Sequence, residues 1–274
     1  MVVEPVRGQH GWVRLEATHL DGRTRLTRLE SQPPVQVMRA IHSDDANPDL
    51  AFVTLCSPSG GILDGDRLEI SLDLESRARV HLNTQSATRI YRMPHGHAEQ
   101  QIDLRLEAHS TLEMIFDPYL PFADSELRQT SRWVVNKTAT LIASEVVGAG
   151  REARGEIAAY RRFAGSLEVK RPDGSLLFRD TYDLRPDSYG IGLGPGWCAL
   201  GTLQVVAPNF DSTAWKSISQ EGSQVGWSDL PNQGGAWLKV LAARTETAQR
   251  VVTEAWMIAR AQLLASPLPP HRRG

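Results

Sequence analysis

The 274-residue sequence predicts a mainly β protein. Short stretches of alternating or continuously apolar residues recur at even intervals, turn residues separate them, and strong helical periodicity is confined to the C-terminal part of the chain. Evenly spaced strands without helices between them are typical of a sandwich, a barrel or a solenoid, and they do not fit a βαβ layout. The sequence has no repeat of fixed period, so the strand pattern alone leaves these three architectures open.

The N-terminal part begins with a hairpin. Residues 11–40 alternate in polarity on both sides of the turn Asp21-Gly22, and Pro33-Pro34 ends the hairpin before a strand at 35–41. The apolar run Leu50–Leu55 is short enough to be a buried strand. It leads directly into a glycine-rich loop.

The middle and C-terminal parts continue the same pattern. Further strands are expected at residues 67–74, 77–83, 100–106, 111–116, 133–145, 197–207 and 236–243. A hairpin is expected from 161–169 and 175–180, because Arg171-Pro172-Asp173-Gly174 has the composition of a tight turn. A glycine-rich aromatic segment occupies 187–196.

Two helices are expected near the C-terminus. Asp211 is suited to cap a helix that runs to about Gln220. Residues 247–264 carry apolar side chains at helical spacing and form the strongest helix of the sequence. Pro267 ends this helix, and 265–274 is expected to be an exposed tail rich in proline and arginine.

The composition restricts the classes of function. The net charge of −2 and the interspersed charges argue against a nucleic-acid-binding surface. The N-terminus lacks the apolar core of a signal peptide and no window has the ~20 apolar residues of a membrane span, so we expect a soluble cytoplasmic protein. Cys56 and Cys198 are the only cysteines; they could form one disulfide, but we expect reduced, packed thiols.

Three motifs carry more information than the composition. The first is the loop Pro58-Ser59-Gly60-Gly61-Ile62-Leu63-Asp64-Gly65-Asp66, in which three glycines permit a tight turn beside two carboxylates. The second is Thr84-Gln85-Ser86-Ala87-Thr88-Arg89-Ile90-Tyr91, which is rich in hydroxyl and amide groups. The third is Val147-Gly148-Ala149-Gly150-Arg151-Glu152-Ala153-Arg154-Gly155-Glu156.

At this separation the three motifs resemble those of the UreD (UreH) family of urease accessory proteins. The family patterns are Gly-Gly-x-x-Gly-Gly-Asp, then Ala-Ser/Thr-Lys/Arg-x-Tyr, then Gly-Arg-x-x-x-Gly-Glu. The resemblance extends from about residue 11 to residue 264 and implies a single UreD-like domain over 1–274. Asp64 replaces a usual glycine, and Arg179-Asp180 reverses the family's Glu-Arg order.

The resemblance implies a fold and a function. It implies an irregular β-helix-like stack of strands closed by two helices near the C-terminus. It also implies a non-catalytic scaffold that binds the urease structural subunits and recruits UreF and, through UreF, the GTPase UreG. No cofactor would be tightly bound; nickel in transit would pass through the interior of the scaffold to the urease active site.

A transit path needs weak oxygen and amide ligands, because strong ligands would trap the ion. The pathway or partner-contact candidates are Asp66, Thr84, Gln85, Ser86, Thr88, Arg89, Tyr91 and Glu156. The glycines and the arginine expected to shape the motifs are Gly60, Gly61, Gly65, Gly150, Arg151 and Gly155.

Each assignment has a competing interpretation. Asp66 closes a turn by accepting backbone N–H groups, or it faces the path. Glu156 forms a buried ion pair with Arg151 that fixes a turn, or it contacts nickel or a partner. Arg89 and Tyr91 face a partner or seal a strand.

Two other functions compete with the scaffold. Asp64 and Asp66 could serve a β-solenoid carbohydrate-active enzyme as paired carboxylates. His95 and His97 are weak metal-ligand candidates, because Gly96 places them in a turn and no third ligand has suitable spacing. The sequence carries no Gly-x-Ser-x-Gly elbow and no Cys-His signature, so we expect a protein without catalytic residues.

Overall fold

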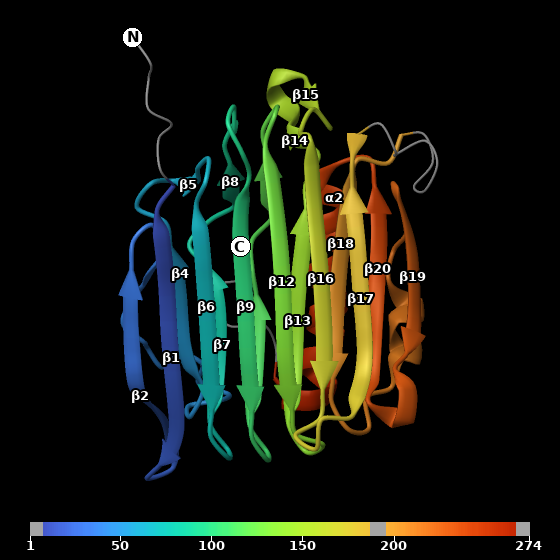
Figure 1. Ribbon diagram of the computed structural model, residues 1–274. Coiled ribbons are helices and arrows are strands. Elements are labelled where there is room, and N and C mark those ends of the chain that lie inside the picture. Colours follow the sequence, from blue (N-terminus) through green and yellow to red (C-terminus); the bar gives the residue numbers. More distant parts are fainter. Residues whose placement is uncertain (1–7, 187–195, 267–274) are drawn as a thin grey trace.

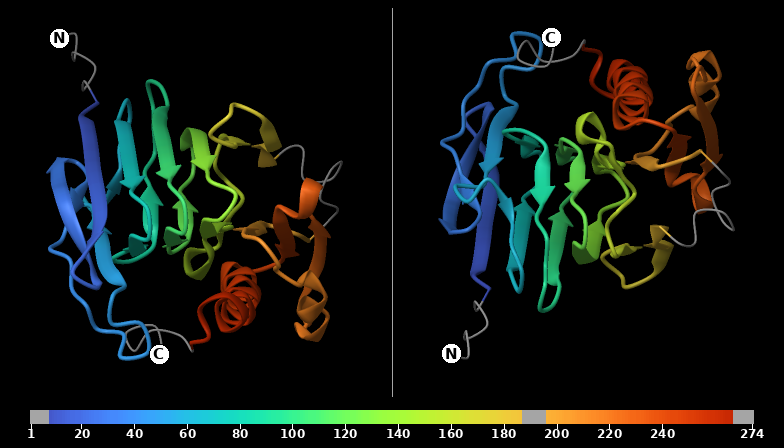
Figure 2. Two further views of the ribbon diagram at one scale, coloured as in Figure 1. Left: turned by 90° about the horizontal axis from the view of Figure 1, so that it is seen from below. Right: turned by 90° about the horizontal axis from the view of Figure 1, so that it is seen from above.

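The computed structural model describes residues 8–186 and 196–266. Two β-sheets lie face to face, and one long helix covers the outer face of the larger sheet (Figures 1 and 2). None of the helices in the described ranges has the length and apolar character needed to cross a membrane. Most of the predicted segment 187–196 and residues 267–274 lie outside the described residues.

Each sheet has a parallel centre and antiparallel margins. The seven-stranded sheet has the order β17 (Leu176–Leu184), β16 (Arg162–Lys170), β12 (Glu126–Val135), β9 (Ala98–Leu106), β6 (Arg67–Leu74), β1 (His10–Leu20), β2 (Arg23–Gln32). The larger sheet has the order β19 (Ser223–Asp229), β20 (Gly235–Ala242), β18 (Ala199–Val206), β13 (Thr140–Val147), β10 (Thr111–Ile115), β7 (Arg79–Thr84), β4 (Ala51–Cys56), β3 (Gln36–Val37).

Five short strands complete the fold. Within the larger sheet, β11 (Tyr119–Pro121) pairs with β8 (Thr88–Ile90), which pairs with β5 (Gly61–Ile62). A separate hairpin joins β14 (Gly150–Arg151) to β15 (Glu156–Ile157). Figure 1 shows β5, β8, β14 and β15 at the same end of the molecule.

The centre of the molecule is a β-solenoid. From β6 to β13 the long strands alternate between the sheets in the order β6, β7, β9, β10, β12 and β13, and each step places a strand beside the previous one in its sheet. Neighbours in this stack are parallel, as in the pairs β6–β9, β9–β12, β7–β10 and β10–β13. The implied β-helix-like stack is therefore confirmed, and the barrel and the ordinary sandwich are not observed.

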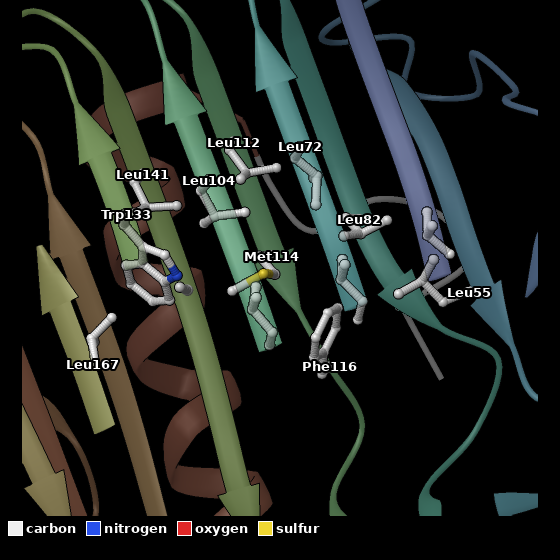
Figure 3. Packing of buried hydrophobic residues seen from close by; sticks show 14 of the residues in the cluster. Leu55, Leu72, Leu82, Leu104, Leu112, Met114, Phe116, Trp133, Leu141 and Leu167 are labelled. Atoms are coloured by element: carbon white, nitrogen blue, oxygen red, sulfur yellow. The ribbon is translucent and has the colours of Figure 1, made fainter. Parts of the chain in front are cut away.

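The main core lies between the two sheets. Aligned strands place like residues in ladders; Leu72 pairs with Leu104, which pairs with Trp133, while Leu112 pairs with Leu141 on the facing sheet (Figure 3). All five side chains are at least nine-tenths buried. Alternation in strands such as Arg67–Leu74 thus buries one face and leaves the other in water.

A second core lies under helix α2 (Thr245–Leu264), on the outer face of the larger sheet. Its buried stripe includes Val251, Ala255 and Trp256. The other predicted helix is the 3-10 helix η3 (Ser212–Ser217), which Asp211 caps by accepting the backbone N–H of Thr213 at 2.9 Å. It is shorter than predicted and ends at Ser217.

Several element boundaries differ from the predictions. The predicted strand 133–145 is two strands, β12 and β13, on opposite sheets, because a turn in which the N–H of Ala139 donates to the carbonyl of Asn136 separates them. Strand β19 was missed, since its residues are mainly polar and it pairs only with β20 at the sheet edge. Ser266, placed in the predicted exposed tail, is 3% exposed and accepts a hydrogen bond from Arg260.

Candidate functional site

The glycine loop and the second motif lie side by side. Gly61 pairs with Arg89 and Ile62 pairs with Ile90 in the parallel strands β5 and β8. A Cβ atom on Gly61 would lie 2.3 Å from the carbonyl oxygen of Arg89, so only glycine permits this approach. Two motifs with 17 residues between them in the sequence therefore form one structural unit.

The buried Asp66 side chain stabilises the glycine loop. Its side chain is 1% exposed, and its carboxylate accepts the backbone N–H of Gln9 at 2.9 Å and that of Leu63 at 2.8 Å. Asp64 accepts the backbone N–H of His95 at 2.8 Å. Both carboxylates bind backbone groups of turns, and nothing in this geometry favours the carbohydrate-active interpretation.

A first cavity of about 100 Å³ opens beside the loop. It lies between β5, β8 and the inner face of the solenoid, and Thr84, Gln85, Ser86, Thr88 and Arg89 all line it, with Gly60 and Gly61. The Thr84 hydroxyl accepts the backbone N–H of Asp117 at 2.9 Å. The structure thus brings residues 84–89 of the second motif to one cavity, whereas Asp66 and Tyr91 are not among its lining residues.

A second cavity of about 40 Å³ lies deeper between the sheets. Phe116 and Tyr119 line both cavities, so these two aromatic side chains form the boundary that the cavities share. Tyr119 donates its hydroxyl to Gln100 at 2.8 Å, and burial raises the pKa of this hydroxyl, with Glu145 adding to the effect. The polar residues around the second cavity are Gln129, Ser131, Ser144, Glu145, Ser166, Asp180, Tyr182 and Gln204.

Glu145 is the central acid of the second cavity. Its carboxyl accepts hydrogen bonds from the Tyr182 hydroxyl and from the Gln129 amide, the latter at 2.6 Å. Burial raises the pKa of Glu145, and neighbouring Asp180 raises it further. Asp180 itself lies 2.8 Å from the Lys239 ammonium.

Asp180, the acid of the reversed pair Arg179-Asp180, lines the second cavity. Strand alternation directs Asp180 into the second cavity, while Arg179 pairs with Glu168 on the outer face of the sheet. Tyr182 fits here because Gly165 is opposite: a Cβ on Gly165 would lie 2.3 Å from the tyrosine ring. Glu145 and Tyr182 were not among the predicted site residues; the available signal was a single acid inside the mainly apolar run 141–147.

The third motif forms the β14–β15 hairpin. Arg151 and Glu156 pair with each other, the Arg151 Nε lying 3.0 Å from Glu156 Oε2, and Glu156 also accepts the backbone N–H of Ala123 at 2.6 Å. The Arg151 guanidinium lowers the pKa of Glu156. Gly150 and Gly155 have φ angles of 115° and 72°, so the hairpin requires glycine at both positions. The ion pair between Arg151 and Glu156 is present, but it is not buried as predicted, since the two side chains are 34% and 16% exposed.

Arg89, Tyr91, Arg151 and Arg154 line a broad outer hollow. Tyr91 packs edge-on against Phe122, with ring centroids 5.2 Å apart. In the described ranges there is no group of three or more His, Cys, Asp or Glu residues arranged to hold a metal ion. His97 lies 3.3 Å from Glu99, and His95 is exposed in the neighbouring turn.

These features define a class, namely a β-solenoid protein with a polar space between its sheets that opens at the end carrying the three motifs. The chain belongs to the UreD family, because the family model for "UreD urease accessory protein" matches residues 9–274.

Curated relatives agree with this membership. A urease accessory protein UreD 2 of Streptomyces griseus is 35% identical over 92% of this chain and 89% of its own length. A UreD 2 of Brucella canis is 32% identical over 96% and 91%, and a UreD of Cenarchaeum symbiosum is 32% identical over 97% and 96%. These names describe an accessory role in the urease system and imply a role without catalysis.

Proposed function

We propose that this protein is the non-catalytic scaffold of nickel insertion into urease. In this proposal it works in the cytoplasm, binds the apo-urease subunits, and recruits UreF and, through UreF, UreG. GTP hydrolysis belongs to UreG. Nickel in transit passes through the polar space between the two sheets, and the scaffold keeps no resident metal.

The observation that carries the proposal is the pair of cavities that meet at Phe116 and Tyr119. A solenoid of this size is most stable with an apolar interior, yet hydroxyl and amide groups line both spaces, and the carboxyl groups of Glu145 and Asp180 line the second. Neutral oxygen ligands hold a hydrated divalent ion weakly, which suits passage better than storage. The exposed Gln85 and Ser86 place the first cavity at the surface, where a partner can deliver the ion.

Ser131 offers a direct test of passage. It interrupts the apolar ladder between Ile102 and Leu167, is 4% exposed and lines the second cavity. Ser131→Val continues the apolar ladder and fills part of the cavity, so we expect the fold to persist while passage is obstructed. Ser71→Val, on the exposed face of the same sheet, is the matched control.

The assay is co-expression of the full chain with the urease structural subunits, UreF and UreG, followed by pull-down and urea hydrolysis. Without this chain we expect inactive urease. With Ser131→Val we expect the complex to form but urease activity to fall several-fold, whereas Ser71→Val activates as the unmodified chain does. Full activity without the chain refutes the scaffold role, and full activity with Ser131→Val refutes passage through the second cavity.

A further inference from the structure

Arg89 occupies an unusual position for a path that admits cations. It is exposed, and it lines both the first cavity and the outer hollow. A Cβ atom on Gly60 would lie 3.7 Å from Arg89 Nη1 and 3.4 Å from the Tyr91 hydroxyl, so both side chains lie over the glycine loop at the opening. A fixed positive charge at this position opposes the approach of a divalent cation.

Two neighbouring arginines are paired with acids. Arg92 lies 3.0 Å from Asp124, and Arg151 pairs with Glu156. Within residues 8–186 and 196–266, no carboxylate lies within 4.0 Å of Arg89 or of Arg154, the exposed arginine of the hairpin. Two free guanidinium groups on one end of a protein with a net charge of −2 form a local site for acidic groups.

The surface around these arginines has the form of a docking site. Two hollows of about 620 Å³ and 540 Å³ adjoin each other and share Leu120, Gly150 and Glu152 among their lining residues. Ile157 is 50% exposed and lines the larger one. The hollows continue into the first cavity through Ala87 and Arg89. Glu152 and Glu246 also line the larger hollow, but Arg244 lies 3.6 Å and 3.8 Å from their carboxylates and offsets their charge. Apolar side chains beside Arg89 and Arg154 therefore fit an apolar side chain flanked by carboxylates.

We propose that this end of the molecule binds an acidic segment of a partner protein, and that a carboxylate of this segment neutralises Arg89 and thereby opens the first cavity to cations. The inference rests on the proposed function, because it adds a condition to the passage described above. Without the partner, Arg89 repels free divalent ions; with the partner docked, its charge is compensated and the ion enters directly from the complex. Docking and entry are thus coupled by one side chain.

The docking half is tested by charge reversal in the full chain. Arg89→Glu and Arg154→Glu together should lower the affinity for the acidic partner by at least about tenfold, and binding of the unmodified chain should weaken as salt increases. The probes are purified UreF and apo-urease, each tested separately. Arg25→Glu is the matched control, since Arg25 is 59% exposed and lies at the start of β2, near the turn of the β1–β2 hairpin.

The gating half uses Cys56, a free thiol that lines the first cavity. In a Cys198→Ser background, Cys56 is the single cysteine of the chain. We expect an anionic methanethiosulfonate reagent to modify Cys56 faster than a cationic one of similar size, and Arg89→Gln to change the ratio of the two rates by about tenfold toward the cationic reagent. This measurement needs no partner and no metal.

The outcomes separate the inference from the proposed function. If UreF and apo-urease both fail to bind the unmodified chain, the proposed function falls and this inference falls with it. If a partner binds and the double reversal binds equally well, only the docking site is refuted. If Arg89→Gln leaves the ratio of reagent rates unchanged, the gate is refuted whatever the binding data give.

Discussion

Replacing Arg260 by methionine should destabilise the protein more than any surface change on the same helix. Arg260 lies near the end of α2 and is fully buried. Its guanidinium donates to Glu113 at 2.5 Å and to Asp44, and these two acids come from β10 and from the loop before β4. One side chain therefore joins the helix to a strand of the larger sheet and to the loop before β4.

The size of the destabilisation follows from the buried acids that lose their partner. Methionine fills a similar volume but leaves the buried acids Glu113 and Asp44 without their shared cation, although Trp256 still donates to Glu113 at 2.8 Å. Removing one partner of a buried ion pair lowers the free energy of unfolding by about 3–5 kcal/mol. For a chain of this size this corresponds to a fall in Tm of roughly 6–20 °C.

The assay is thermal and urea denaturation of the full chain, with Arg250→Met as control. Arg250 is on the same helix but is 44% exposed, and its pair with Glu254 at 3.6 Å contributes only about 0.2–0.5 kcal/mol. If Arg260→Met is no more destabilising than Arg250→Met, the cluster does not anchor the helix.

The same cluster has a pH signature. Burial alone would raise the pKa of Glu113, but hydrogen bonding and charge from His81, together with Arg260, lower it below its ordinary value of 4.5. A lowered folded-state pKa gives stability that is present above the ordinary value and is lost as the pH falls through the folded-state value. The acid-induced loss of stability should therefore be smaller in a Glu113→Gln variant, although that variant is less stable at neutral pH.

Two further predictions concern the motif end and the interior. Gly61→Ala should destabilise the protein by about 1–3 kcal/mol or more in urea denaturation, because the new Cβ lies 2.3 Å from the Arg89 carbonyl oxygen. Gly226→Ala is the control and should be nearly neutral, because its added Cβ has no atom within 4 Å. Glu145→Gln should become more stable relative to the unmodified chain as the pH rises. The raised pKa of Glu145 stabilises the unmodified protein fully at pH values below the ordinary pKa of a glutamate. This stabilisation is lost as the pH rises through the folded-state pKa. Parallel pH dependences of unfolding for the two proteins would show that Glu145 does not titrate in a buried site.

The elements predicted correctly are those that local chemistry dictates. Alternation in Arg67–Leu74 reflects a period of two residues, the C-terminal helix reflects a period of 3.6 residues, and the turn Asp21-Gly22 reflects its turn-forming residues; the structure has all three elements. Strands β12 and β19 were not predicted correctly, because their polar residues obscure the alternation. In β12 the inward-facing Gln129 and Ser131 line a cavity and not an apolar core, so the pattern that reveals most strands is absent there.

The sequence by itself determined the mainly β class, the positions of most strands and of the long helix, and, through three motifs, the membership of the UreD family. The tertiary structure alone decided that Thr84 to Arg89 line one cavity, that Asp66 is committed to backbone N–H groups, and that Glu145 and Asp180 meet inside. The reason is physical: side-chain direction within a strand follows from local alternation, but contact between strands far apart in sequence depends on the register of parallel neighbours, which only the packed sheets fix.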